Sequence, residues 1–318
     1  MTVLRPFALA MLASLSFACA AASSPETSGA PPGTPGTSGD QGTGLGSGGG
    51  GGGGVTLEDG SGADCADENK QIYVVTQEKG LYRFAPASLA FTKIGTLACP
   101  AASTARPFSM AVDRSGVAWV LYNDARIYKV STADGSCTAT SFVPGQSGWT
   151  KFGMAFVADA PGSASESLFV STGRWNDPAD PESGYQALAR IDTKSLKLSV
   201  VGDTFPSTAE LTGTGSAKLF AFVTGDALNP SAVTEVDRSS GAPIAPKKLG
   251  GLSDVGAFAF AFWGGKFWIF TATGAGPGGT KVTRYSYDDG ASKVMIPDAG
   301  FTVVGAGVST CAPTARPK

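Results

Sequence analysis

One polar stretch, TGRWNDPADPESGYQ (172–186), combines aromatic rings with carboxylate, amide and guanidinium groups. Its candidate ligand-binding residues are Arg174, Trp175, Asn176, Asp177, Asp180, Glu182 and Tyr185. Sugar rings stack on aromatic faces, and sugar hydroxyls exchange hydrogen bonds with planar polar groups. This composition therefore predicts a carbohydrate-binding surface. The alternative is that Trp175 packs inward to fix its loop and that the acids are solvated turn formers.

Two further loops are expected on the same surface. PGQSGWTKFG (144–153) contributes Trp149, and GDALNPS (225–231) contributes Asp226 and Asn229. Trp149 would extend the aromatic platform or, in the alternative, pack inward like Trp175. The acidic run NDPADPE could also supply oxygen ligands to a structural Ca²⁺, although its spacing is not that of an EF-hand. Apart from that ion, no cofactor is predicted.

A hydrolytic function would need paired carboxylates. Many glycosidases use an acid of raised pKa together with a partner carboxylate nearby. Glu210 is the best candidate and Asp254 the second, because both fall where predicted innermost strands begin. The chain has no histidine, which excludes Ser-His-Asp and Cys-His catalysis and histidine-ligated zinc. A binding or scaffolding module is therefore the preferred function, with a hydrolase as the alternative.

Phosphate and nucleic-acid binding are not expected. The glycine run GSGGGGGGG (46–54) has no predicted strand before it and no helix after it, and a P-loop needs both. Residues 65–318 carry nearly balanced charges without a basic cluster, which nucleic-acid binding would require. The predicted partner is therefore a carbohydrate or an envelope protein.

A repeated motif predicts the elements that position these loops. Five segments share an apolar start, a long charged residue at the third place, and Leu or Gly at the end: LYRFAPASL (81–89), IYKVSTADG (127–135), LARIDTKSL (188–196), VTEVDRSSG (233–241) and VTRYSYDDG (282–290). Alternating strands surround each copy and are joined by Gly, Asn and Asp turns. Four-stranded units at this period are typical of a β-propeller. We therefore expect an all-β, five-bladed β-propeller.

Strand counting predicts how the ring closes. The first unit lacks one strand, and FTVVGAGVSTCAP (301–313) at the other end is one strand too many. The C-terminal strand is therefore expected to complete the first blade, which leaves no open sheet edge. Six blades are the alternative, but they would need a unit hidden in 143–165 or 289–311.

The cysteines bear on the same closure. Four remain after Cys19, namely Cys65, Cys99, Cys137 and Cys311, and four cysteines allow three pairings. The closed ring makes Cys65 and Cys311 neighbours, which leaves Cys99 to pair with Cys137. That second pair is difficult, because Cys99 follows an outer strand and Cys137 begins one. The two should then lie toward opposite rims of adjacent blades.

The N-terminal region predicts export. Residues 1–22 have one positive charge, Arg5, followed by an apolar run, which is the layout of a signal peptide. LSFAC places Cys19 where bacterial lipoproteins are cut and lipidated, although small-x-small cleavage sites are also present. Residues 23–62 are rich in Gly, Ser, Thr and Pro and predict a flexible linker. We expect a folded domain over 63–318, at the outer membrane, in the periplasm or on the cell surface, that meets the membrane only through its N-terminal lipid.

The segment VDRSGVAWVLY (112–122) resembles the strand-turn-strand unit of NHL-type and gluconolactonase-like propellers. Together, the lipidation motif, the linker and the degenerate blades resemble the uncharacterised β-propeller lipoproteins of bacterial envelopes. That resemblance implies a propeller fold and an envelope location. Five-bladed propellers also include arabinanase-like glycosidases, which is the basis of the hydrolase alternative.

Overall fold

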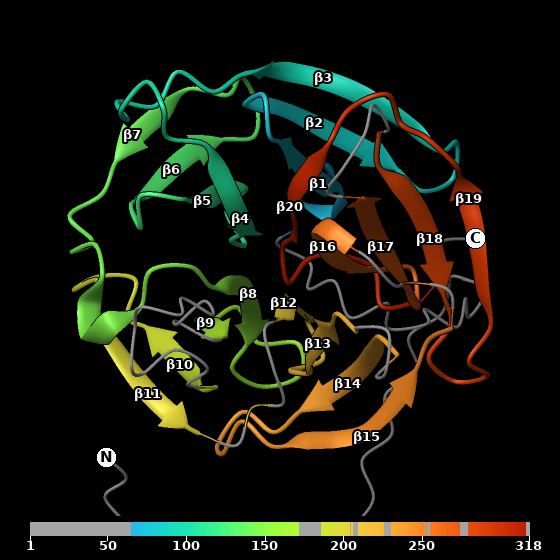
Figure 1. Cartoon of the computed structure of the whole chain (residues 1–318). Coiled ribbons are helices and arrows are strands. Elements are labelled where there is room, and N and C mark those ends of the chain that lie inside the picture. Colours follow the sequence, from blue (N-terminus) through green and yellow to red (C-terminus); the bar gives the residue numbers. More distant parts are fainter. Residues whose placement is uncertain are drawn as a thin grey trace, which may run out of the picture. The chain divides into compact units, whose positions relative to one another are not determined.

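The computed structural model describes residues 65–171, 186–203, 205, 209–225, 230–250, 252, 255–273 and 279–315. The chain divides into two compact units, residues 1–54 and 55–318, and all described residues belong to the second. These residues form five four-stranded antiparallel sheets arranged as the blades of a ring (Figure 1). The five-bladed β-propeller is thus confirmed. Among the described residues, no helix is long and apolar enough to cross a bilayer.

Each blade is a meander whose strands run from the centre of the ring outward, with blade one completed from the C-terminal side. Blade one contains β20 (Val303–Val308), β1 (Ile72–Thr76), β2 (Gly80–Ala85) and β3 (Ala90–Thr96). Blade two contains β4 (Pro107–Val112), β5 (Val117–Tyr122), β6 (Ile127–Ser131) and β7 (Cys137–Ala139). Blade three contains β8 (Gly153–Ala158), β9 (Glu166–Ser171), β10 (Leu188–Ile191) and β11 (Leu198–Gly202). Blade four contains β12 (Ala209–Gly213), β13 (Leu219–Val223), β14 (Ala232–Val236) and β15 (Pro243–Lys248). Blade five contains β16 (Val255–Trp263), β17 (Lys266–Thr273), β18 (Lys281–Tyr285) and β19 (Ser292–Ile296). Two short 3₁₀ helices, η1 (Asp67–Lys70) and η2 (Gln146–Gly148), precede blades one and three.

The meander gives the ring two faces. We call the face that carries the second-to-third strand connections and the blade-to-blade loops the linker face; it includes 77–79 and 297–302. The opposite face carries the first-to-second and third-to-fourth strand turns, and we call it the turn face; it includes 113–116 and 132–136. Both assignments follow from the antiparallel strand order within each blade.

The repeated motif closes the third-to-fourth strand turn of every blade. Its last residue has a positive φ each time, at Leu89 (57°), Gly135 (77°), Leu196 (56°), Gly241 (77°) and Gly290 (71°). Glycine adopts this left-handed conformation without a Cβ penalty, whereas leucine is strained in it. Leu196 is 8% exposed and belongs to a hydrophobic cluster, so its burial offsets the strain there.

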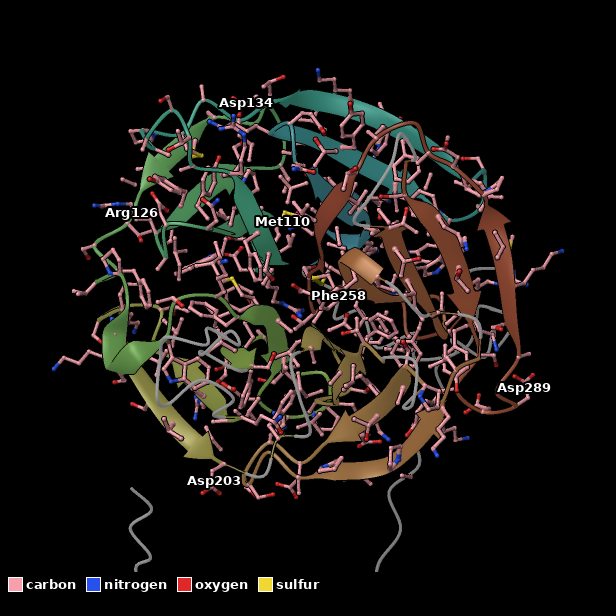
Figure 2. All side chains as sticks on the ribbon, in the orientation of Figure 1. Met110, Arg126, Asp134, Asp203, Phe258 and Asp289 are labelled. Carbon is pink, nitrogen blue, oxygen red and sulfur yellow. A yellow bond between two sulfur atoms is a disulfide. The ribbon has the colours of Figure 1, made fainter. Side chains whose placement is uncertain are left out.

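Small residues on the inner strands reflect how closely those strands approach one another. A Cβ added to Gly153 of β8 would lie 2.2 Å from the carbonyl oxygen of Ala209 in β12. A Cβ added to Gly213 of β12 would lie 2.0 Å from the carbonyl oxygen of Phe156 in β8. No side chain fits at such distances, so glycine is required at both places. Figure 2 shows Met110 of β4 near the centre of the ring and Asp289 at its rim.

The hydrophobic core lies mainly between neighbouring blades. Trp119 of blade two meets Phe156 of blade three, with ring centroids 5.8 Å apart. Phe222 of blade four meets Phe260 of blade five at the same centroid distance. Each blade therefore buries its apolar faces against its neighbours, as expected when repeated sheets stack around a ring.

Blade one closes the ring as strand counting predicted. β20 pairs antiparallel with β1, from Ile72 opposite Val308 to Thr76 opposite Val303. A disulfide joins Cys65 to Cys311 across a sequence separation of 246 residues. In the chain-entropy treatment, a link over so long a loop stabilises the native state by about 5 kcal/mol. The six-bladed alternative is excluded by this arrangement.

The second disulfide joins Cys99 to Cys137, with their Cα atoms 4.9 Å apart. The prediction that these residues lie toward opposite rims is wrong, because the strands of a blade do not run in one common direction. Each strand pairing turns the next strand by roughly 20–25°, so the outermost strand of a blade runs well away from the direction of the innermost one. A Cβ on Gly95 of β3 would lie 2.9 Å from the carbonyl oxygen of Asp134. The end of β3 therefore lies against the β6–β7 turn of blade two, close to Cys137.

Candidate functional site

Glu210 lies in the centre of the ring. It belongs to the inner strand β12 and is 3% exposed. Ser109 Oγ, from the inner strand β4, donates a hydrogen bond to Glu210 Oε2 over 2.9 Å. The backbone N–H of Met154 in β8 also bonds the carboxyl, but burial dominates and raises the pKa of Glu210 well above its ordinary value. The carboxyl group of this blade-four residue thus contacts the inner strands of two other blades, two and three.

This environment suits a protonated carboxyl more than a reactive pair. In the described part of the chain, the hydrogen-bond partners of Glu210 are a hydroxyl and a backbone amide, not a second carboxylate. Asp254, the predicted partner, lies outside the described residues. A catalytic role for Glu210 stays a prediction, while its position between inner strands agrees with where it was expected.

A second acid, Glu166 at the start of β9, links three blades on the turn face. The backbone N–H of Arg114 donates to Glu166 Oε1 over 2.7 Å, and Thr310 Oγ1 donates to Oε2 over 2.8 Å. Burial raises the pKa of Glu166, while these two bonds oppose the shift. Sequence reasoning missed this residue, because a lone glutamate that begins a strand gives no signal for partners in two other blades. Its bonds tie blades one, two and three together on the turn face.

The predicted aromatic platform is wrong at Trp149. Its side chain is 1% exposed and packs near Phe152, with ring centroids 6.2 Å apart. The cause is the preceding helix η2, where the Gln146 amide donates to the Leu196 carbonyl and accepts from the Leu198 N–H, both over 2.9 Å. These bonds hold the loop onto blade three and turn Trp149 inward, which was the alternative interpretation.

The other candidate residues cannot be placed. Those that lie outside the described residues are Cys19, Arg174, Trp175, Asn176, Asp177, Asp180, Glu182, Tyr185, Asp226, Asn229 and Asp254. The acidic run considered for Ca²⁺ is among them. Within the ranges that the structure covers, no three Cys, Asp or Glu side chains group closely enough to hold a metal ion.

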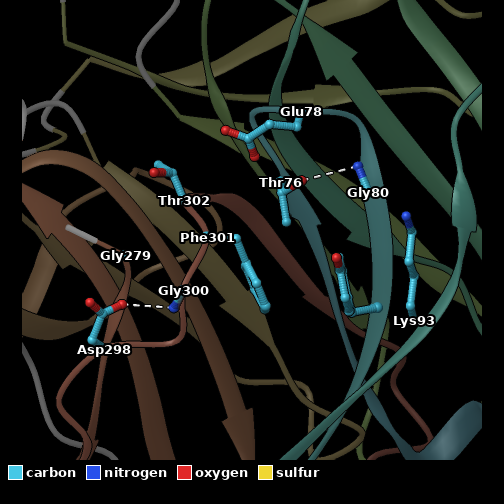
Figure 3. A pocket seen from close by; sticks show the side chains of 10 residues that line it. Thr76, Glu78, Gly80, Lys93, Gly279, Asp298, Gly300, Phe301 and Thr302 are labelled. Carbon is cyan, nitrogen blue, oxygen red and sulfur yellow. Dashed lines mark hydrogen bonds between the residues drawn. The ribbon is translucent and has the colours of Figure 1, made fainter. Parts of the chain in front are cut away.

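A pocket of about 630 Å³ opens on the linker face between blades one and five (Figure 3). It is lined by Thr76, Glu78, Gly80, Tyr82, Lys93, Gly279, Asp298, Gly300, Phe301 and Thr302. Tyr82 of β2 and Phe301 before β20 stack with ring centroids 4.6 Å apart and an interplanar angle of 15°. Both side chains are half-buried, whereas Glu78, Lys93 and Asp298 are exposed. The pocket thus combines an aromatic wall with two carboxylates and one ammonium group.

The pocket holds its shape through local hydrogen bonds. The backbone N–H of Gly80 donates to Thr76 Oγ1 over 3.0 Å, and that of Gly300 donates to Asp298 Oδ1 over 2.7 Å (Figure 3). Asp298 keeps a second carboxylate oxygen for a ligand. Sequence reasoning missed this pocket because its two walls come from opposite ends of the chain and meet only through ring closure.

Comparison with known proteins yields distant likenesses of fold. No protein-family model and no curated protein sequence matches the chain. The crystal structure of a nidogen/laminin complex contains a chain with TM-score 0.44 and 11% identity, covering 74% of this chain and 97% of that one. The crystal structure of TolB from Acinetobacter baumannii gives TM-score 0.42 and 13% identity, covering 73% of this chain and 54% of TolB. At these values, neither structure informs the function of this chain.

Proposed function

We propose that this chain is an exported carbohydrate-binding module of the cell envelope, tethered through a lipid on Cys19. The observation that carries the proposal is the linker-face pocket, where the stacked rings of Tyr82 and Phe301 stand beside Glu78, Lys93 and Asp298. Its volume of about 630 Å³ is within the range of pockets that hold small ligands.

The chemistry of the pocket suits a polyhydroxylated ligand. The aromatic wall offers an apolar surface to the C–H face of a sugar ring, and the carboxylates and ammonium group offer hydrogen bonds to its hydroxyls. Thr302 is half-buried and adds a hydroxyl oxygen to the lining, whereas Thr76 is 2% exposed and accepts from the Gly80 N–H. Mixed polar and aromatic lining favours a sugar over a purely apolar ligand.

Export is supported by the two disulfides and by the leader-like residues 1–22. Disulfides persist in oxidising compartments and are rare in the cytosol. A lipid on Cys19 followed by the linker 23–62 would keep the domain at a membrane while leaving it free to reach a ligand.

Hydrolysis is not part of the proposal. Glu210, on the inner strand β12, is 3% exposed and bonded to Ser109, so its carboxyl group is closed off from a substrate. A glycosidase-like mechanism would also need Asp254 nearby, and no observation on the described residues favours that.

The test is a thermal unfolding screen with oligosaccharides and cell-wall fragments. A ligand at one hundred times its Kd stabilises the native state by about 2.7 kcal/mol, which raises the midpoint. We expect one glycan class to raise the midpoint and the double variant Glu78→Gln, Lys93→Gln to abolish that rise. Glu68→Gln, an exposed acid in η1 that does not line the pocket, is the matched control and should keep it. The proposal fails if no glycan raises the midpoint, or if all variants respond equally.

A further inference from the structure

A second cavity, of about 370 Å³, lies on the turn face between blades five and one. Its walls include Leu89, Met295, Trp263 and Trp268, and its basic side chains are Lys266 and Arg284. None of the described residues that line it is acidic. We call it the tryptophan groove. It is distinct from the linker-face pocket, since its walls come from the β2–β3 and β16–β17 turns.

The repeat shows what is unusual about this groove. In every blade, an aromatic residue of the second strand faces a charged residue of the third strand: Tyr73 with Arg83, Trp119 with Lys129, Phe169 with Arg190, Phe220 with Glu235, and Trp268 with Arg284. The charged residues come from the third place of the repeated motif. The five pairs can therefore be compared position by position.

The charged residues of blades two, three and four have partners, and Arg83 of blade one is exposed to solvent. Lys129 Nζ lies 4.3 Å from the centroid of the Trp119 ring. Arg190 donates to Ser167 Oγ over 2.6 Å. Glu235 forms an ion pair with Lys218, whose Nζ donates to Glu235 Oε2 over 3.0 Å. Arg284, by contrast, is half-buried and has no hydrogen-bond or ion-pair partner among the described residues. With no acceptor among the described residues, the guanidinium of this half-buried side chain depends on solvent or on a ligand for its hydrogen bonds.

Trp268 is missing a partner as well. Its side chain is 3% exposed, and its Nε1 has no acceptor in the described part of the chain. In blade two, the equivalent Trp119 Nε1 donates to Asp113 Oδ2 over 3.0 Å. The registers place Ala111 opposite Trp119 and Ala261 opposite Trp268, so Asp113 of blade two corresponds to Trp263 of blade five. Blade five has thus exchanged an acid for an aromatic ring at this position.

Lys266 is the second basic side chain of the groove. Lys266 Nζ donates to Ser286 Oγ over 2.7 Å and, together with a Ser286 hydrogen bond, its positive charge also helps to lower the pKa of nearby Asp289, which does not line the groove. The described lining of the groove therefore combines two cationic side chains with an apolar floor and contributes no carboxylate of its own.

We propose that the tryptophan groove binds a small molecule that joins a carboxylate to an aromatic or aliphatic body. The carboxylate pairs with the planar guanidinium of Arg284, whose fork of N–H donors matches its two oxygens, and Lys266 adds a second positive charge. The apolar body lies along Trp263, Leu89 and Met295. A volume of about 370 Å³ fits a small ligand better than a folded partner. This site does not depend on the proposed carbohydrate-binding function.

Calorimetric titration of the whole exported protein with two matched probes tests the proposal. The probes are 1-naphthylacetate and its neutral analogue 1-naphthylacetamide, which share the aromatic body and differ in the carboxylate. We expect saturable binding of the acid and at least tenfold weaker binding of the amide, equal to about 1.4 kcal/mol. Arg284→Gln should weaken acid binding about tenfold and leave amide binding unchanged. Arg190→Gln, at the equivalent place in blade three, is the matched control and should bind the acid like the wild type.

Three outcomes would overturn the proposal. They are the absence of saturable acid binding up to the solubility of the probe, equal affinity for acid and amide, and undiminished acid binding by a folded Arg284→Gln variant. Thermal unfolding establishes that each variant is folded. If Arg284→Gln does not fold, two measurements decide. One is the comparison of acid with amide on the wild type. The other is acid binding by Lys266→Gln, with Lys218→Gln at the same place in blade four as its control.

Discussion

The buried carboxyl of Glu210 should make the stability of the propeller depend on pH in a specific direction. Burial raises the pKa of this group well above 4.5, its ordinary value and the one expected in the unfolded chain. Above pH 4.5 the unfolded chain therefore loses a proton that the native state retains. The stabilisation that Glu210 contributes is complete below its pKa in the unfolded chain. It is lost as pH rises through its pKa in the native state.

The magnitude follows from proton linkage. One proton of difference between native and unfolded states changes the free energy of unfolding by about 1.4 kcal/mol per pH unit. Glu210→Gln does not titrate and resembles the neutral acid, and the Ser109 hydroxyl can rotate to accept from the new amide. The free energy of unfolding of the wild type should therefore fall relative to Glu210→Gln by about 1.4 kcal/mol per pH unit above pH 4.5, until the native pKa is reached.

Urea unfolding of both proteins, with disulfides intact, at a series of pH values from about 4 to 8 measures this difference. Subtracting the two curves removes the contributions of Glu166 and of the turn aspartates, which both proteins share. A difference that stays constant with pH would refute the argument, because it would mean that Glu210 has the same protonation in the native and unfolded states.

Two further predictions concern turns and loops. Gly290 closes its turn at a φ of +71° with nothing within 4 Å of an added Cβ, so Gly290→Ala should lower the free energy of unfolding by about 1 kcal/mol through left-handed strain alone. Gly290→Asn, which tolerates that conformation, should cost less, and equal costs in urea unfolding would argue against the strain. Gln146→Ala should release the loop from blade three and expose Trp149, seen as a red shift of tryptophan fluorescence. Trp149→Phe in the Gln146→Ala background assigns the signal, and an unshifted spectrum would show that other contacts hold the loop.

The fold could be predicted because each blade repeats the same local rules. The third-to-fourth strand turn needs a residue in the left-handed conformation, as at Gly135 and Gly241. Residues that suit this turn therefore recur in the sequence once per blade. Counting strands was then enough to place the strand that contains Gly305 in blade one and to pair Cys65 with Cys311.

The sites were harder to predict because they depend on contacts between blades. The local sequence around Trp149 predicts a ligand platform and does not report that Gln146 anchors the loop to blade three. The rings of Tyr82 and Phe301 come together only after the ring closes, and nothing in either local stretch indicates the other. The geometry of Cys99 and Cys137 depends on accumulated sheet twist, which a pattern of alternating residues does not report.

Closure through Cys65 also determines how the domain would respond to a mechanical load. A pull on the chain before Cys65 enters the ring at two points, through η1 into β1 and through the disulfide into the segment that follows β20. These are the two innermost strands of blade one, and they are hydrogen-bonded to each other from Ile72 to Thr76. The load is therefore shared between both sides of one interior pairing and does not peel a single strand from an edge. A domain tethered at this point would therefore be loaded through an interior strand pairing that a disulfide also joins.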